Sequence, residues 1–149
     1  MRRFFLAVMV TLLPLTLFAK MEFSNPKPSF DHPRKWVVPV KTDDIHVINH
    51  IIGGINNVLN EYPPESLQVA MVFYSSGMRV IRKDYDAKTL TRLKSLMDGY
   101  DVEMVGCINT MKTMGWKKKD YIDGIIYRQA GIAEVLERSV AGWIIFAPY

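Results

Sequence analysis

The sequence predicts an α/β fold, specifically a three-layer α/β/α sandwich around a five-stranded, mostly parallel sheet. Three observations support this prediction. Strand-like apolar segments alternate with single segments whose apolar residues recur at helical spacing. One apolar run, 69–74, is continuous, which is typical of a strand covered on both faces. The 149 residues, 49% hydrophobic and 23% charged, suffice for one globular domain.

The first two elements are a strand at 36–40 and a helix that follows it. Pro39 favours an edge position or an irregular end for the strand, because proline donates no ladder hydrogen bond. The Thr-Asp-Asp segment at 42–44 supplies N-cap side chains. Apolar residues at helical spacing then continue to about Asn60, where we expect the helix to end.

The remaining elements continue the alternation to the end of the chain. A strand at 69–74 is ended by Ser75-Ser76-Gly77, residue types that favour turns. Trp36 and Trp143 lie in expected strands and are predicted to be core residues. The other expected elements are a helix at 87–98, a strand at 102–107, a short helix from Thr110, a strand at 125–127, a helix at 131–141 and a strand at 143–147.

Residues 1–19 are predicted to be a signal peptide for export. Arg2 and Arg3 precede an uncharged run, 4–19, whose 16 residues fall short of the roughly 20 needed to span a bilayer. We expect cleavage after Ala19 and a periplasmic product. The alternative is an uncleaved membrane anchor, which would also place the domain in an oxidising compartment.

Residues 20–34 are predicted to form an extended, proline-rich leader, and residues 35–149 the folded domain. Loss of Arg2 and Arg3 with the signal lowers the formal net charge from +4 to +2. So small a surplus does not indicate a nucleic-acid partner, which usually requires a dense basic face.

Cys107 is the only cysteine, which excludes an intramolecular disulfide and a two-cysteine exchange cycle. It falls at the end of a predicted strand and just before a helix, where α/β sheets bind ligands. Helix N–H groups, Lys112 and the lysine run at 117–119 would favour the thiolate. We therefore expect an exposed sulfur with a lowered pKa. The alternative is a small core residue, since free cysteines are often buried.

Other motifs give weaker predictions. His46 and His50 are spaced i,i+4 with Asp43 upstream, but no convincing fourth ligand is present, so we predict no metal site and no cofactor. Trp116 and the lysine run at 117–119 are predicted to form a mobile loop over the pocket. The sequence contains no Ser-His-Asp set, phosphate-binding loop or dinucleotide fingerprint.

Four segments together resemble the DsrE/DsrF-like family, in the order in which they occur here. The stretch "VEMVGCINTM" is similar to that family's strand, cysteine and Asn-Thr turn. The others are the Trp-led first strand with its Asp-rich cap at 36–44, "VINHIIGGINNVLN" at 47–60 and "AGIAEVLERSVAGWIIFAP" at 130–148. Ser75-Ser76-Gly77 stands where the family usually has a Gly-Pro-Gly-like turn. The chain is most similar to an exported, stand-alone branch.

The resemblance implies the same five-stranded sandwich, assembled as homotrimers or related oligomers. It also implies that Cys107 carries sulfur as a persulfide, with a sulfur donor and an acceptor thiol as partners. Asn109 and Thr110 would donate hydrogen bonds or cap the helix beside the sulfur, although both residue types also serve turns. Three residues that end the neighbouring strand, Tyr74, Ser75 and Ser76, are predicted to line the same pocket.

Two functional hypotheses follow. The first is a sulfur carrier or sulfurtransferase that acts through Cys107. The second is a non-enzymatic module that uses the clefts of the same fold for a small molecule or for assembly, with a buried and inert cysteine. Burial of Cys107 would favour the second hypothesis.

Overall fold

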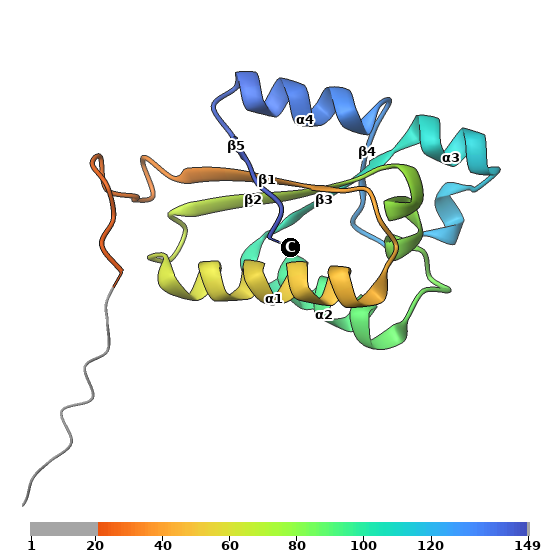
Figure 1. Ribbon diagram of the computed structural model, residues 1–149, viewed down its shortest axis with the longest axis horizontal. Helices are drawn as coiled ribbons and strands as arrows, with labels where there is room; N and C mark the ends of the chain where they lie inside the picture. Colours follow the sequence, from red (N-terminus) through yellow and green to blue (C-terminus); the bar gives the residue numbers. More distant parts are fainter. Residues whose placement is uncertain (1–20, 149) are drawn as a thin grey trace, which may run out of the picture.

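The computed structural model describes residues 21–148, and these form one five-stranded sheet flanked by helices (Figure 1). The strands lie in the order β4-β3-β2-β1-β5, and every neighbouring pair is parallel. The strands are β1 (Arg34–Val40), β2 (Leu67–Phe73), β3 (Glu103–Cys107), β4 (Ile126–Arg128) and β5 (Ile144–Ile145). The helices are α1 (Ile45–Glu61), α2 (Ala87–Tyr100), α3 (Ile108–Met114) and α4 (Gly131–Val140), with two 3-10 helices, η1 (Ser75–Ile81) and η2 (Lys118–Asp120).

The two faces of the sheet are covered unequally. Helices α1 and α2 lie side by side on one face, and α4 crosses the other (Figure 1). The larger core lies beneath α1, whose buried face consists of Ile48, Ile51, Ile52 and Ile55. Beneath α4 there is only a small cluster built on Val37, Val72 and Val105. Because the cluster beneath α4 is small, much of this helix remains exposed.

Side-chain caps fix the starts of the two long helices. Asp44 accepts hydrogen bonds from the main-chain N–H groups of His46 and Val47, at 2.8 and 3.1 Å. Asp86 does the same for Thr89 at the start of α2. A carboxylate at this position satisfies unpaired N–H groups and interacts favourably with the helix dipole. The expected cap within 42–44 is therefore present, at Asp44.

The predicted fold class is confirmed, and the element boundaries differ by one to three residues in most cases. β5 is shorter than expected, because only residues 144 and 145 pair with β1. Trp143 consequently lies just before the strand and is half-buried, whereas Trp36 is buried as predicted. The 3-10 helix η1 was not predicted. It occupies the connection that leads from β2 towards α2.

β1 lies between β2 and β5, but Pro39 itself pairs only on the β2 side, so the edge of β1 is open at this position, as the sequence predicted. The carbonyl of Val37 accepts from Phe146, whereas the carbonyl of Val40 accepts from Tyr74 on the β2 side. Alternation along the strand therefore turns the nitrogen of Pro39 to the β5 side. β5 pairs only with Trp36 and Val37. The N–H group that Pro39 lacks therefore leaves no carbonyl of a neighbouring strand without a hydrogen bond.

The leader contains no helix or strand before β1, but it contacts the domain. Arg34 donates hydrogen bonds to the carbonyl oxygens of Ser24 and Pro26, and Phe23 packs edge-on against Tyr62. The predicted signal at 1–19 lies outside the described residues. Within residues 21–148, none of the helices combines the length and apolarity that a membrane crossing requires.

Candidate functional site

The candidate site lies at the carboxyl ends of β2, β3 and β4, where α3 and α4 begin (Figure 1). Cys107 is the last residue of β3 and the N-cap residue of α3. Gly131 is the first residue of α4. Two helix N-termini therefore converge on one thiol at the edge of the sheet where ligands bind in α/β proteins.

The sulfur of Cys107 has close polar neighbours on α3 and in the turn just before α4. The main-chain N–H of Thr110 donates to Sγ over 3.5 Å, and Sγ lies 3.9 Å from the carbonyl oxygen of Gln129, to which a thiol can donate. A Cβ atom at Gly131 would lie 3.3 Å from the Cβ of Cys107. The start of α4 thus packs directly against the cysteine.

The expectation of an exposed sulfur is wrong, because Cys107 is only 5% exposed. The physical reason is the close approach of α4 and β2. Gly131 brings the helix start onto Cys107 and onto Tyr74, whose Cβ would lie 2.9 Å from a Cβ at position 131. The end of a strand in this fold is exposed to solvent only where no helix start covers it. Here the start of α4 covers the end of β3.

The expectation of a lowered pKa is met. Burial raises the pKa of the Cys107 thiol, but hydrogen bonds from the Thr110 side chain and from the main-chain N–H groups of Thr110, Gly131 and Asn109 lower it further, so the net shift is downward. No lysine is among these main causes. The thiolate is therefore stabilised by the starts of two helices rather than by the basic residues that the sequence suggested.

Thr110 and Ser75 connect the thiol to the end of β2. The main-chain N–H of Ser75 donates to the Thr110 hydroxyl over 3.1 Å. Ser75 holds a left-handed backbone conformation, with a φ of 53°, which is uncommon for serine. Both predicted residues are therefore within the site.

Asn109 has a supporting position rather than a direct contact of its side chain with sulfur. Its main-chain N–H donates to the carbonyl of Gln129 over 3.0 Å, and its side-chain oxygen accepts from the Gln129 amide. The pair holds the turn between β4 and α4 against α3. Asn109 thus positions the carbonyl that faces the thiol.

Tyr74 and Ser76 differ in their relation to the site. Tyr74 contacts the start of α4 and packs against both hydrophobic clusters. The hydroxyl of Ser76 donates to the carbonyl of Lys41 over 2.9 Å, so its hydrogen bond is directed to the end of β1. The structure therefore brings Tyr74, Ser75, Asn109 and Thr110 together around Cys107, and turns Ser76 away.

Sequence reasoning missed three residues that contact Cys107. The main-chain N–H of Cys107 donates to the sulfur of buried Met78 over 3.2 Å, and Gln129 and Gly131 lie against its side chain. A glycine as the first residue of a predicted helix, a few positions after a predicted strand, was the available signal for Gly131. Nothing in the pattern distinguishes Met78 from any other core methionine.

The segment that contains Trp116 and the lysine run packs against the domain through aromatic and cation–π contacts, and its mobility stays a prediction. Trp116 packs against Tyr121, and the guanidinium of Arg82 lies 4.8 Å from its ring centroid. Lys118 lies over the ring of Tyr127 at 4.7 Å. Burial raises the pKa of Tyr121 to about 12, which keeps its hydroxyl protonated at neutral pH.

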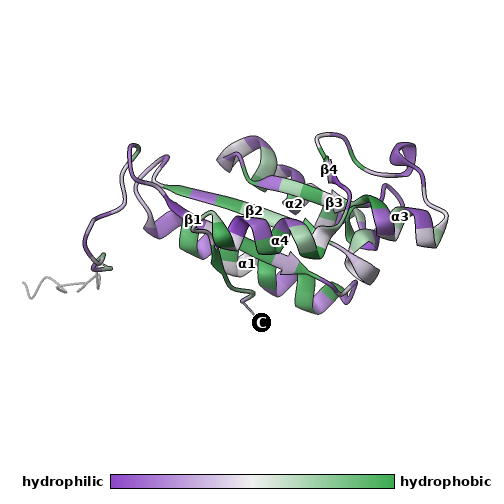
Figure 2. Cartoon of the chain, turned by 90° about the horizontal axis from the view of Figure 1, so that it is seen from above, coloured by the Kyte–Doolittle hydropathy of each residue, from purple (hydrophilic) through white to green (hydrophobic). Residues whose placement is uncertain are grey.

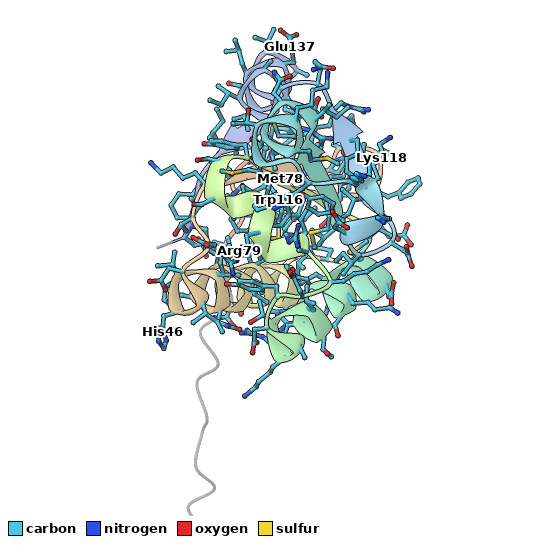
Figure 3. All side chains as sticks on the ribbon, turned by 90° about the vertical axis from the view of Figure 1, so that its right-hand side faces the viewer. His46, Met78, Arg79, Trp116, Lys118 and Glu137 are labelled. Atoms are coloured by element: carbon cyan, nitrogen blue, oxygen red, sulfur yellow. The ribbon has the colours of Figure 1, made fainter. Side chains whose placement is uncertain are left out.

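His46 and His50 are exposed on α1, and His46 lies at the far end of the molecule from Glu137 in Figure 3. In the described part of the chain, no group of three His, Cys, Asp or Glu residues is placed to hold a metal ion.

A cleft of about 450 Å³ lies between α2 and the segment before β4, and includes none of the candidate residues. Its lining combines charged and apolar side chains, namely Lys83, Lys94, Asp98, Asp123, Leu90, Met97 and Ile122, with Thr91 and Gly124.

Comparisons with known proteins agree with this architecture. The model of the DsrE/DsrF/DrsH-like family matches residues 27–144. Among solved structures, the fold is similar to that of MTH1491, a protein of unknown function from Methanobacterium thermoautotrophicum, with a TM-score of 0.70 and 23% sequence identity. The similarity covers 77% of this chain and 99% of that one. No curated protein matches the sequence.

Proposed function

Because the chain belongs to the DsrE/DsrF/DrsH-like family, we propose that it is an exported sulfur carrier that holds sulfur as a persulfide on Cys107. The observation that carries the proposal is the convergence of the α3 and α4 N-termini on the Cys107 sulfur. Together with the Thr110 side chain, their N–H groups lower the pKa of the thiol despite its burial. Thiolate is the nucleophilic form, so this environment favours sulfur transfer over simple packing.

Transfer requires two displacement steps that balance without an added oxidant. In the first, the Cys107 thiolate attacks the outer sulfur of a persulfide donor R–S–SH. The S–S bond of the donor breaks, R–S⁻ leaves, and Cys107 becomes Cys–S–SH. In the second, an acceptor thiolate attacks that outer sulfur, takes it as a new persulfide, and leaves the Cys107 thiolate.

The protein groups around the sulfur have defined parts in these steps. The N–H groups of Thr110 and Gly131 stabilise the thiolate before attack and again when it leaves. The Gln129 carbonyl faces the sulfur at 3.9 Å and accepts a hydrogen bond from the thiol form. Asn109 holds that carbonyl in place through its bond to the same residue.

Burial of Cys107 favours a second candidate, a binding or assembly module with an inert cysteine. A sulfur that is 5% exposed resembles a packed core residue, and the large cleft beside α2 is separate from it. In that case the cleft, with its two lysines and two aspartates, would hold the ligand.

Intact mass after treatment with inorganic polysulfide separates the two candidates. The carrier gains the mass of one sulfur atom on the folded protein, and Cys107→Ala gains none. Reduction with a small thiol removes the added sulfur and restores the original mass. If the native thiol gains no sulfur and reacts with an alkylating reagent only after unfolding, the carrier proposal fails and the binding module remains.

The proposed setting is the periplasm, after cleavage of a signal behind Ala19. Sequencing of the N-terminus of the protein recovered from cells tests this part separately. A start at Lys20 in the periplasmic fraction supports it. An intact Met1 in the membrane fraction would indicate an anchored protein instead.

A further inference from the structure

The cleft between α2 and the segment before β4 has an apolar floor. Its three large apolar side chains, Leu90, Met97 and Ile122, are half-buried and pack against the larger core. Gly124, with a φ of 84°, brings its turn onto this floor, since a Cβ there would lie 2.5 Å from Cε of Met97. In Figure 2, hydrophobic and hydrophilic residues alternate along α2, the helix that forms one wall.

The rim of the cleft carries charges of both signs on both walls. α2 contributes Lys94 and Asp98, and the opposite wall contributes Lys83 and Asp123. All four residues are exposed. Among residues 21–148, none of their side chains forms a salt bridge or a hydrogen bond. Two cations and two anions around one apolar floor are therefore available to a bound molecule.

Asp98 lies where the chain itself disfavours a negative charge. It is in the last turn of α2, where the helix dipole favours cations, and that turn has no basic residue. Lys94 precedes it by four positions, which is the weaker order for an i,i+4 ion pair, and the two side chains form no salt bridge. A cationic group from outside the chain would compensate this placement.

We propose that this cleft binds a dipeptide that has free termini and apolar side chains. The ammonium group would lie at Asp98 and Asp123, the carboxylate at Lys83 and Lys94, and the side chains over the apolar floor. A volume of about 450 Å³ is within the range of small-molecule sites. At roughly 30 Å³ for each water molecule, it has room for about 15 non-hydrogen atoms, which suits a dipeptide better than a single amino acid.

Other classes of ligand fit the lining less well. The two lysines and two aspartates cancel in charge, so the cleft offers no net attraction to a nucleotide or another polyanion. A large uncharged ligand would take water from the four charged groups without replacing it. The inference rests on the second candidate function, in which the cleft holds the ligand, and does not require Cys107 to be inert.

Calorimetric titration of the full protein with the dipeptide Leu-Leu tests the inference. We expect a Kd below about 1 mM, and at least about tenfold weaker binding of N-acetyl-Leu-Leu and of Leu-Leu-amide, each of which lacks one terminal charge. Free leucine, which has the same charges and about half the atoms, should also bind at least about tenfold more weakly. Equal binding of the peptide with both termini blocked would overturn the inference, as would no binding of Leu-Leu at about 10 mM.

Two substitutions locate the binding in this cleft. Asp98→Asn should weaken the binding of Leu-Leu at least about tenfold. Asp101→Asn is the matched control, because Asp101 is exposed directly after α2, does not line the cleft, and holds a left-handed conformation that asparagine tolerates. Equal effects of the two substitutions would overturn the inference. Lys83→Met, on the opposite wall, gives an independent test, since it should reduce the preference for Leu-Leu over Leu-Leu-amide.

The outcome for the cleft is separate from the outcome for the thiol. Cys107→Ala should bind Leu-Leu with unchanged affinity, and Asp98→Asn should gain sulfur from polysulfide as the wild type does. A native thiol that gains sulfur therefore leaves the peptide inference intact. Absence of peptide binding overturns the inference even if the thiol is inert.

Discussion

Gly131 lies against Cys107 so closely that the position has no room for a side chain. A Cβ there would come within 3.3 Å of the Cβ of Cys107 and 2.9 Å of that of Tyr74. These distances are at or below the closest that Cβ contacts normally reach. The absence of a side chain at the first residue of α4 is therefore what allows the helix N-terminus to reach the thiol.

Gly131→Ala should move the start of α4 away from Cys107. We expect a loss of about 1–3 kcal/mol in the free energy of unfolding, typical of overpacking, and a rise in the pKa of the thiol. Gly99→Ala is the matched control, because Gly99 lies in α2 with open space around it and should gain about 0.5–1 kcal/mol. Urea denaturation measures both. Equal effects of the two substitutions would contradict the close contact.

Thr110→Val should raise the pKa of Cys107, because the hydroxyl and the main-chain N–H of Thr110 are the largest causes that lower it. The measurement is the rate of alkylation of the folded protein against pH, whose midpoint should move upward. Thr113→Val is the control, since the Thr113 hydroxyl donates to the carbonyl of Asn109 and not to the sulfur. Equal midpoints for wild type and Thr110→Val would show that the Thr110 side chain does not lower the pKa of Cys107.

Stability should depend on pH through Cys107. Because the folded pKa lies below the ordinary value of a free thiol, the thiolate contributes stability that is complete above the unfolded pKa and is lost as pH falls through the folded pKa. The difference in unfolding free energy between wild type and Cys107→Ser should therefore grow from pH 6 to pH 9.5. A difference that stays flat or shrinks over this range would show that the folded pKa is not lowered.

Arg138→Ala should destabilise the attachment of α4 to the sheet. The guanidinium is 11% exposed and bridges Glu103 on β3 to Glu134, so its removal leaves two partly buried carboxylates without their partner. We expect a loss of about 2 kcal/mol, against less than about 1 kcal/mol for Arg128→Ala, whose side chain is 51% exposed. Thermal denaturation of both variants provides the comparison. Similar losses would mean that burial does not distinguish the two arginines.

Gly77→Ala should prevent η1 from closing over the end of β1. A Cβ at this position would lie 2.1 Å from the carbonyl oxygen of Val40, which is main chain and cannot move aside. We expect a loss of about 4 kcal/mol or more, or failure to fold. Gly53→Ala, with its nearest neighbour at an ordinary 3.7 Å in α1, should be tolerated. Soluble yield and denaturant midpoint measure the contrast.

The alternation of apolar periods was enough to predict the class, the parallel sheet and all five strands. The cap at Asp44 and the helical spacing of α1 could also be predicted, because they depend on residues close in the sequence. The 3-10 helix η1 could not be predicted from the sequence. Its segment, Ser75–Ile81, has no clear helical spacing, and it is held by a contact between Gly77 and a carbonyl on a different strand.

The candidate site was predictable only in part, for a related reason. The position of Cys107 at a strand end follows from local pattern, and so does the N–H environment that lowers its pKa. Its burial does not, since it depends on how closely α4 returns to β2 and β3. That distance is set by Gly131 and Tyr74, which lie 24 positions after and 33 positions before the cysteine in the numbering.

The placement of β5 beside β1 also constrains the order in which the molecule assembles. β2 pairs with one edge of β1 and follows it after a connection of moderate length. The other edge of β1 has no partner until residues 144 and 145, much later in the sequence, pair with it. Loop closure over such a separation is slow and comes late. The nearly completed sheet therefore exposes one edge of β1 during folding, and the last two-residue strand is the part expected to exchange its amide hydrogens first.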